Sequence, residues 1–300
     1  MGLSAWGRNA RRAAVLSLLV PGLGHLYAGA PRRGAVVWVA SRVATAALLE
    51  AAVVIGGRPG LTIQIAGMIA VWVVAAADAV RTGERSTRAG PRPHQWYNRG
   101  IVYLGICAIV AAGTIPWHIV LGGTIAEMRR VPNDTMAPTL VAGDHVYAAP
   151  RRGSVVQRGD IIVYRKWGTG YIKRVVGTGG DTLAMRGGVL SVDQRPVSEP
   201  YASHAGEGES SDRRLEWQRA LIADSLRGSY APTVATWGPI VVPRGEYFLM
   251  GDNRGESIDS RYTGFVPDSE VVARPVVVFF SRDPVSGRLR WKRVGVRVGD

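Results

Sequence analysis

The chain of 300 residues is 47% hydrophobic and carries a formal net charge of +14. Its basic residues are nearly all Arg, and they form neither a basic helix nor a basic surface interleaved with aromatic residues, which argues against a nucleic-acid partner. Cys107 is the single cysteine and the five histidines lie far apart in the sequence. This pattern excludes an intrachain disulfide and argues against a metal site.

The first 128 residues are predicted to form an α-helical membrane region. A helix needs about 20 apolar residues to cross a bilayer, and three segments meet this length: residues 34–55, 61–80 and 100–121. A fourth apolar segment, 13–30, is interrupted by Pro-Gly-Leu-Gly at 21–24, so it either spans the membrane or forms a re-entrant or interfacial hairpin. A cleaved leader peptide fits less well, because further spans follow and no small-x-small site ends the segment.

The distribution of arginines predicts the orientation of these segments. A loop at 81–99 holds five arginines against one acidic residue, Glu84, and such loops stay in the cytoplasm. Residues 56–60 then form an outer loop, and residues 129–300 lie on the extracytoplasmic face of a multi-pass protein of the plasma (inner) membrane. A re-entrant 13–30 is favoured because it keeps two further groups of arginines inside: Arg8, Arg11 and Arg12 before it, and Arg32 and Arg33 after it.

Two charged residues interrupt the first predicted span. Arg42 and Glu50 are eight positions apart and therefore share a helix face. We expect them to act as a buried pair, or to find partners on neighbouring helices, and so to hold the helices together. The alternative is a polar path for transport, since charges inside a membrane are costly and often functional.

From residue 129 onward the pattern changes to that of an all-β domain. Short runs with alternating apolar residues end in Gly, Pro or Asp, which is typical of strands joined by turns. The predicted strands are 145–148, 161–165, 171–176, 189–192, 240–242, 247–250 and 276–281. Residues 203–229 form a polar insertion with a short helix expected around 215–226.

Three sequence motifs follow one another within this domain. The first is Val-Pro-Asn-Asp-Thr-Met-Ala-Pro-Thr-Leu at 131–140. The second is Arg-Gly-Asp-Ile-Ile-Val-Tyr at 158–164, which leads into Tyr-Ile-Lys-Arg-Val-Val-Gly at 171–177. The third is Gly-Asp-Asn-Arg at 251–254, followed by Ser-Ile-Asp-Ser-Arg at 257–261. In this order and spacing the chain resembles the bacterial type I signal peptidases, peptidase family S26.

The resemblance implies a signal-peptidase-like β domain with a hydroxyl–lysine dyad. The family's nucleophile stands immediately before the Met of the first motif, here Thr135, and its general base is the Lys two residues after the Tyr, here Lys173. A base must be uncharged to accept a proton, so Lys173 must have a pKa well below the usual value of about 10.4. Burial of the amine lowers its pKa. Tyr171 and Lys173 point to the same face of a strand, so Tyr171 can pack beside the base.

The third motif is expected to support the dyad. By family resemblance, Ser257 hydrogen-bonds the Lys173 amine, and Asp259 and Arg261 form an ion pair beneath the site. Asp252 fixes the loop that carries the motif. A turn with surface charges is the simpler interpretation of such a cluster on its own, since exposed pairs contribute little.

The first motif departs from the family at two positions. Thr135 replaces the usual Ser, and its extra methyl restricts χ1 and crowds the attack path. Asn133 stands where the family has a Ser that joins the nucleophile's N–H in the oxyanion hole; its side-chain amide can donate the same hydrogen bond. The two changes are consistent either with an active threonine enzyme or with a catalytically impaired relative.

Met136 and Pro132 are assigned to the substrate-binding surface next to the nucleophile. Met136 is either part of an apolar lip that touches the membrane or an ordinary core residue. The family accepts small residues before the scissile bond, which shallow apolar pockets along strands that pair with an extended peptide would explain.

The resemblance therefore predicts a membrane-bound endopeptidase that removes N-terminal signal peptides from exported preproteins and that needs no metal and no cofactor. The implied partners are preprotein signal peptides, the lipid bilayer and, as a further candidate, the export translocon. Three alternatives stay open. They are a non-catalytic membrane protein that binds leader peptides or export machinery, a maturase for one specialised substrate, and a transporter with the β domain as sensor.

Overall fold

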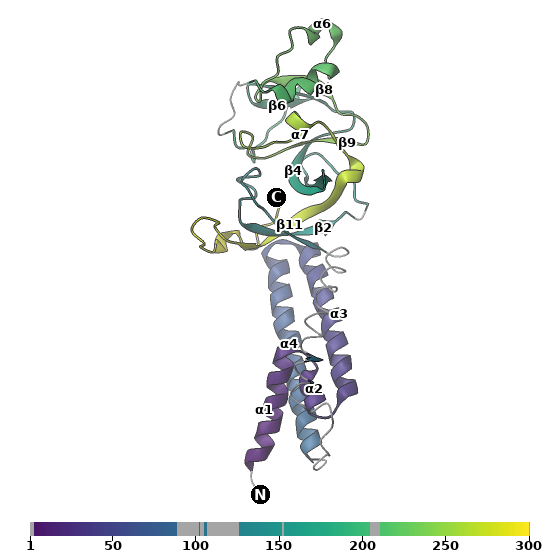
Figure 1. Ribbon diagram of the computed structural model, residues 1–300, viewed down its shortest axis with the longest axis vertical. Helices are drawn as coiled ribbons and strands as arrows, with labels where there is room; N and C mark the ends of the chain where they lie inside the picture. The colour runs from purple at the N-terminus through teal and green to yellow at the C-terminus, as the bar shows by residue number, and fades with distance from the viewer. Residues whose placement is uncertain are drawn as a thin grey trace. The chain divides into compact units, whose positions relative to one another are not determined.

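The computed structural model describes residues 3–88, 102, 105–106, 126–151, 153–204 and 211–299. The chain divides into two compact units, Met1–Ala126 and Glu127–Asp300 (Figure 1). The first unit is helical in its described part, and the second is mostly antiparallel β-sheet.

Residues 3–88 of the first unit form four helices: α1 (Leu3–Leu19), α2 (Leu23–Tyr27), α3 (Pro31–Ile55) and α4 (Gly57–Arg88). Helices α1 and α3 both pack against α4 (Figure 1). Within the described residues, α3 and α4 are long and apolar enough to cross a membrane. They contain the predicted segments 34–55 and 61–80, whereas the predicted segment 100–121, with Cys107, lies outside the described residues apart from 102, 105 and 106.

Two predicted loops of this unit are largely helical where the structure describes them. The outer loop expected at 56–60 shrinks to Gly56, which has a φ of 66° and joins α3 directly to α4. Pro59 marks a turn in the sequence, but it falls in the first turn of α4, where its missing N–H breaks no helical hydrogen bond. At the other end α4 continues through residues 81–88, which were expected to belong to a cytoplasmic loop; this stretch contains no proline that would end the helix.

The Pro-Gly-Leu-Gly run separates α1 from α2, and the two helices pack closely on each other. A Cβ on Gly24 would lie 1.9 Å from the Ala13 carbonyl oxygen, so only glycine fits there. The Gly24 N–H also donates to Ser17 Oγ at 3.1 Å. A re-entrant course for 13–30 stays a prediction.

Polar contacts join α2, α3 and α4, and they differ from those expected. His25, which is fully buried, contacts Asp78 through Nε2 at 2.8 Å, and Arg33 donates two hydrogen bonds to the same carboxylate. By contrast, the direct pairing considered for Arg42 and Glu50 is wrong: Arg42 Nε is buried without a hydrogen-bond partner. Eight residues correspond to about 12 Å along a helix, which is too far for the two side chains to pair.

The second unit is built on a seven-stranded antiparallel sheet with the order β1-β2-β11-β3-β4-β9-β10. Buried and partly buried residues alternate along β2 and along most of β11, as expected for strands with one face on a core. The strands are β1 (Glu127–Arg130), β2 (Asp144–Pro150), β3 (Ile161–Lys166), β4 (Thr169–Thr178), β9 (Glu246–Met250), β10 (Val266–Pro267) and β11 (Val271–Ser281).

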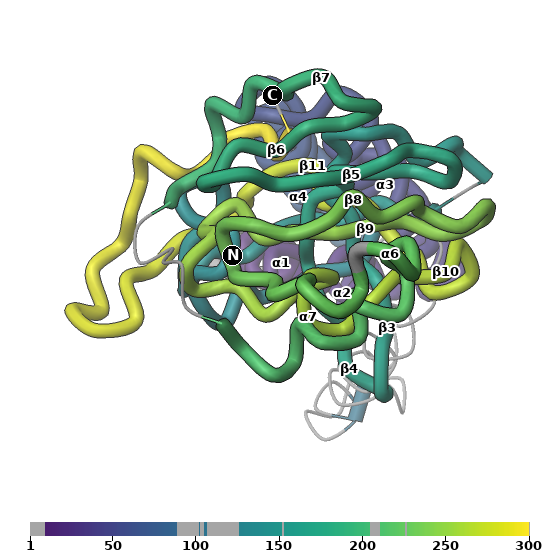
Figure 2. Tube along the Cα trace, turned by 90° about the horizontal axis from the view of Figure 1, so that it is seen from above, coloured from purple at the N-terminus to yellow at the C-terminus, as the bar shows by residue number. Residues whose placement is uncertain are grey.

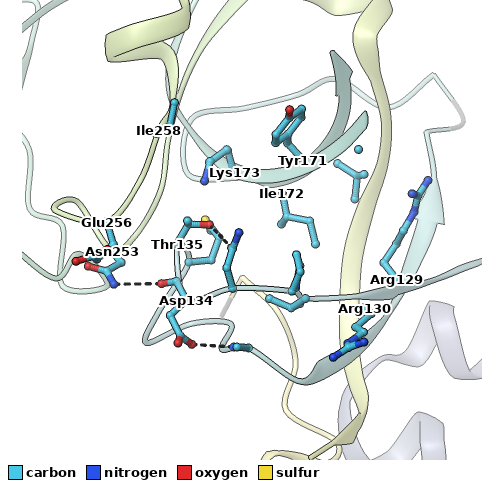
Figure 3. Close-up of a pocket in the computed structure, with 17 residues that line it drawn as sticks. Arg129, Arg130, Asp134, Thr135, Tyr171, Ile172, Lys173, Asn253, Glu256 and Ile258 are labelled. Carbon is cyan, nitrogen blue, oxygen red and sulfur yellow. Dashed lines mark hydrogen bonds between the residues drawn. The ribbon is translucent and has the colours of Figure 1, made fainter. Parts of the chain in front are cut away.

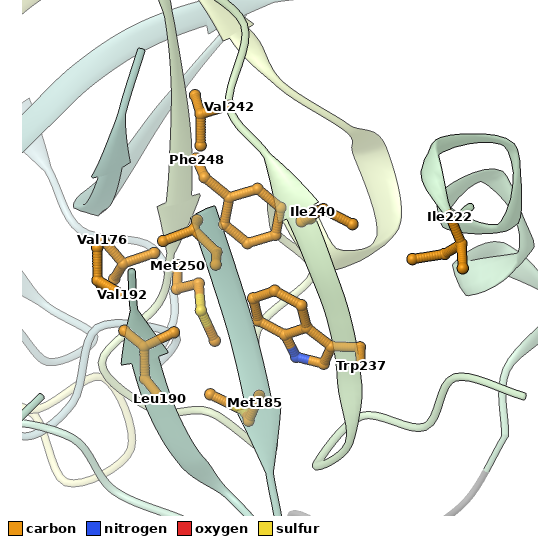
Figure 4. Packing of buried hydrophobic residues seen from close by; sticks show 11 residues of the cluster. Val176, Met185, Leu190, Val192, Ile222, Trp237, Ile240, Val242, Phe248 and Met250 are labelled. Atoms are coloured by element: carbon orange, nitrogen blue, oxygen red, sulfur yellow. The ribbon is translucent and has the colours of Figure 1, made fainter. Parts of the chain in front are cut away.

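A smaller four-stranded sheet has the order β7-β6-β5-β8, with β5, β6 and β8 side by side in Figure 2. Its strands are β5 (Thr182–Arg186), β6 (Val189–Val192), β7 (Arg195–Pro196) and β8 (Trp237–Val241). An apolar core joins this sheet to β4 and β9, with Trp237 stacked on Phe248 at a centroid distance of 5.1 Å (Figure 4). This core fixes the far end of β4, the strand that carries Lys173.

Short helices complete the second unit. The single helix expected around 215–226 is two pieces, the 3-10 helix η2 (Arg213–Leu221) and the turn α6 (Asp224–Arg227). The break occurs because Ile222 is extended and buries its side chain in the core of the small sheet. The others are α7 (Ser260–Thr263), η3 (Asp268–Glu270) and η4 (Trp291–Arg293).

Candidate active site

A cavity of about 870 Å³ in the second unit brings the first two motifs together. Thr135 and Lys173 both line it, although they are 38 residues apart in the sequence (Figure 3). Arg129, Arg130 and Glu256 add charges to its wall. The predicted nucleophile and base therefore line one cavity, whose wall also carries charged residues.

The loop between β1 and β2 holds Thr135 in place through its backbone. The Val131 N–H donates to the Asp144 carbonyl at 2.8 Å, and the Ala142 N–H donates to Asp134 Oδ1 at 2.8 Å. From the third motif, the Asn253 N–H donates to the Thr135 carbonyl at 3.2 Å. Because hydrogen bonds hold both sides of the loop, the backbone of Thr135 is fixed at the cavity wall.

The Thr135 hydroxyl donates a hydrogen bond to Asn133 Oδ1 at 2.9 Å. Asn133 is exposed and also lines the cavity. The oxygen of its amide therefore faces the hydroxyl, and the two residues that depart from the family pattern contact each other directly. Its NH₂ group is the end expected to donate into an oxyanion hole.

Lys173 lies on β4 opposite Ile162 of β3, and its side chain is 3% exposed. Burial lowers the pKa of Lys173 to about 8, helped by the nearby Arg261 cation and opposed by Asp259 and Asp252. Within the described residues no hydrogen bond joins Lys173 Nζ to Thr135 Oγ1, a contact that often tightens only when substrate is bound. A substantial fraction of the amine is neutral at mildly alkaline pH.

Tyr171 lies two residues before Lys173 and lines the same cavity. It is half-buried, and its ring stacks on Tyr164 with the centroids 5.4 Å apart. Burial raises the pKa of Tyr164 above its usual value, so this phenol stays neutral. The two rings supply an apolar surface close to the base.

The third motif contains a fully buried ion pair. Arg261 Nε donates to Asp259 Oδ1 and Nη2 to Oδ2, each at 3.0 Å, and both side chains are 0% exposed. Asp259 also accepts from the Gly251 N–H at 3.0 Å and caps α7 through the Arg261 N–H. Burial alone would raise the pKa of Asp259, but the Arg261 charge and its hydrogen bonds hold it below the usual value.

Ser257 does not make the hydrogen bond expected from the family. Its Oγ is buried and has no hydrogen-bond partner, so the predicted contact with the Lys173 amine is not formed in this state. The hydroxyl instead lies against Gly251, where a Cβ would come within 2.3 Å of it. This close approach explains why the position before Asp252 is glycine.

Asp252 is tied to Arg174, a residue to which the sequence motifs assign no specific role. Arg174 donates to both carboxylate oxygens of Asp252, at 2.8 and 2.7 Å, and the two side chains are buried. Thr139 also donates to Asp252, at 2.5 Å, and the Arg174 guanidinium stacks on Tyr201. Because Arg174 follows Lys173 directly on β4, this pair fixes the strand of the base to the loop of the third motif.

A second buried pair was also missed. Arg254 donates to the two carboxylate oxygens of Glu199, at 2.8 and 2.5 Å, and both side chains are almost fully buried. Arg254 Nε donates to the Gly251 carbonyl as well. Glu199 lies outside all three motifs, and nothing in its sequence neighbourhood indicates a partner 55 residues away.

Met136 is 1% exposed and packs with Val131, Leu140 and Val146 in the core. Met136 is therefore a core residue rather than a lip that touches lipid, although it also lines the cavity beside Thr135. The turn after Thr135 directs this side chain inward. Pro132 is exposed and lines the cavity, so it is available to contact a substrate.

Comparison with known proteins decides the family. The family model described as "Signal peptidase, peptidase S26" matches residues 100–280. This chain belongs to the S26 signal peptidases. It is thereby a hydrolase of the serine-type endopeptidase class, related to the type I signal peptidases.

Alignments with individual S26 relatives cover most of each relative's length. A signal peptidase I from Bacillus licheniformis is 30% identical, with 66% of this chain and 95% of that protein aligned. A probable signal peptidase I-1 from Synechocystis is 29% identical over 68% of this chain and 90% of its own. A crystal structure of a signal peptidase I from Enterococcus faecalis covers 40% of this chain and 97% of its own, with 29% identity and a TM-score of 0.29.

Proposed function

We propose that this S26 peptidase removes N-terminal signal peptides from exported preproteins, with Thr135 as nucleophile and Lys173 as general base. The observation that supports the proposal most strongly is one cavity that is lined by a hydroxyl and by a desolvated amine with a lowered pKa. A lysine with these properties is the base that a Ser–Lys or Thr–Lys mechanism requires.

The reaction begins when a substrate displaces the Thr135 hydroxyl from Asn133. Thr135 Oγ1 attacks the scissile carbonyl while neutral Lys173 takes the hydroxyl proton. The Thr135 N–H and the Asn133 NH₂ stabilise the negative charge on the carbonyl oxygen. Lys173 then gives its proton to the leaving amine, and the acyl group remains on Thr135 as an ester.

A water molecule completes the cycle. Lys173, neutral again after protonating the leaving amine, removes a proton from the water as it attacks the ester. The second tetrahedral intermediate collapses and releases the signal peptide with a free carboxylate, and the proton returns from Lys173 to Thr135 Oγ1. No group besides these side chains and water is needed to balance the reaction.

We place the peptidase in the plasma membrane, with the β unit on the extracytoplasmic face. Helices α3 and α4 supply candidate spans, and the arginines at the end of α4 match the rule that places basic residues in the cytoplasm. The substrates are then preproteins whose signal peptide is already in the bilayer, and the export translocon is a candidate neighbour.

The function is tested by incubating the purified full-length chain in lipid vesicles with a preprotein that has small residues before the predicted cut. We expect release of a mature protein with one defined N-terminus, identified by mass spectrometry. A set of preproteins with bulky residues at that position serves as the matched control and should stay uncut. A chain that binds the signal peptide without cutting any preprotein would contradict the proposal.

The pH dependence of cleavage follows from the lowered pKa of Lys173. The base is active when neutral, so kcat/KM should be constant well above pH 8 and fall about ten-fold per pH unit below it. The measurement is kcat/KM on one preprotein from pH 6 to pH 10. A profile that is flat over this range would contradict a lysine base.

A further inference from the structure

The polar insertion, residues 203–229, contacts the third motif at Arg261, beside the predicted dyad. Gln218 of η2 is 0% exposed, an unusual environment for an amide. Its Nε2 donates to the Arg261 carbonyl at 3.0 Å, and Trp217 Nε1 donates to the same carbonyl at 2.8 Å. Two side chains of the insertion therefore saturate one carbonyl oxygen of α7.

These hydrogen bonds have a structural cause. Helix α7 has four residues, so its last carbonyls have no partner within the helix and need donors from elsewhere. Tyr230 anchors the donor in turn: its hydroxyl donates to Gln218 Oε1 and accepts from the Gly238 N–H, each at 2.8 Å. Trp217 is also held edge-to-face on Phe265, with the centroids 5.5 Å apart.

The contacts continue from Arg261 to the nucleophile without a gap. The Arg261 side chain binds Asp259, and Asp259 accepts from the Gly251 N–H. Gly251 lies so close to the nucleophile loop that a Cβ would come within 2.4 Å of the Thr135 carbonyl oxygen. Among charged groups, Asp259 and Arg261 also have the largest effects on the pKa of Lys173.

We propose that Gln218 and Trp217 are positioning residues. By gripping the Arg261 carbonyl, the insertion holds the Asp259–Arg261 pair where it sets the charge around Lys173. The inference rests on the proposed function, because it concerns the residue assigned there as the base. The insertion would then affect catalysis through the position of these two charged side chains.

The direction of the effect follows from the charges. Arg261 lowers the pKa of Lys173, and Asp259 raises it. When Arg261 is released, the lysine loses a repelling cation, Asp259 loses its partner, and water enters; all three changes raise the pKa of the amine. Loss of the hydrogen bonds to the Arg261 carbonyl therefore raises the pKa of Lys173 towards its ordinary value, and a smaller fraction of the amine is neutral at pH 7.

The test is Gln218→Met in the full-length chain, which keeps the side-chain volume and removes both hydrogen bonds. We expect the acid limb of kcat/KM to move up by about one pH unit, with a loss of about ten-fold at pH 7 and little loss above pH 10. The matched control is Glu216→Gln in the same helix, which removes an exposed pair with Arg219 and should leave the profile unchanged. Trp217→Phe should give a smaller shift in the same direction.

A second readout separates this inference from the dyad itself. In a Thr135→Ala background, the pKa of the Lys173 amine is read from the pH dependence of its acetylation by acetic anhydride, followed by peptide mass spectrometry. We expect Gln218→Met to raise that pKa even where no cleavage occurs, which would support the link whatever the outcome for the nucleophile. An unchanged pKa, or a loss of cleavage that is equal at every pH, would overturn it.

Discussion

Replacing Thr135 with alanine is expected to abolish preprotein cleavage, whereas Thr135→Ser is expected to preserve it. Alanine has no hydroxyl to form the acyl intermediate, and loss of a hydroxyl nucleophile costs on the order of 10⁶-fold in kcat. Serine keeps the hydroxyl and lacks the methyl that restricts χ1. We therefore expect Thr135→Ser to cut at a rate within about ten-fold of the natural enzyme.

The measurement is kcat/KM on one preprotein, with binding of the signal peptide measured in parallel. Thr135→Ala should still bind the peptide, because the backbone bonds that hold the loop do not involve the side chain. If Thr135→Ala cuts as fast as the natural enzyme, the nucleophile is elsewhere. If Thr135→Ser is as inactive as Thr135→Ala, the geometry around Asn133 has been misjudged.

The second large effect is expected from Asp259→Asn. This change keeps the shape of the side chain but leaves the Arg261 guanidinium buried without a countercharge, which costs about 3–5 kcal/mol of unfolding free energy. Asn has a single acceptor oxygen, so it can still cap α7 through the Arg261 N–H but cannot also accept from the Gly251 N–H. Denaturant unfolding of the full chain in detergent, followed by tryptophan fluorescence, measures the loss.

A double variant separates the charge effect from loss of shape. Asp259→Asn combined with Arg261→Met removes both charges, and we expect it to recover about half of the lost stability, because no unpaired charge remains. Recovery should be incomplete, since Arg261 Nη2 also donates to the Arg254 carbonyl at 2.6 Å. Equal stability of the single and double variants would contradict the importance of the buried charge.

The fold was predictable wherever local patterns dominate. Alternating residues identified strands such as β2, and apolar length identified α3 and α4, because these signals depend on near neighbours in the sequence. The joint at Gly56 was misjudged because Gly and Pro are read as loop residues, although the first turn of a helix accepts Pro without loss. Local chemistry alone does not tell a turn from a helix start.

The site residues that belong to the motifs were predictable, whereas those contributed by distant parts of the sequence were not. Thr135 and Lys173 were found from their motifs and line one cavity. Glu199 and Gln218 were missed, since each is a polar residue in a polar stretch and its burial depends on segments 43 to 55 residues away. Only tertiary packing makes such residues part of the site.

The most direct test of the central claim is kcat/KM of Lys173→Met at pH 9, with Lys292→Met as the matched control. Methionine keeps the length and apolar packing of the buried side chain but cannot accept a proton. We predict a loss of at least about 10³-fold for Lys173→Met and no loss for the exposed Lys292. Cleavage by Lys173→Met within about three-fold of the natural enzyme would show that this amine is not the base.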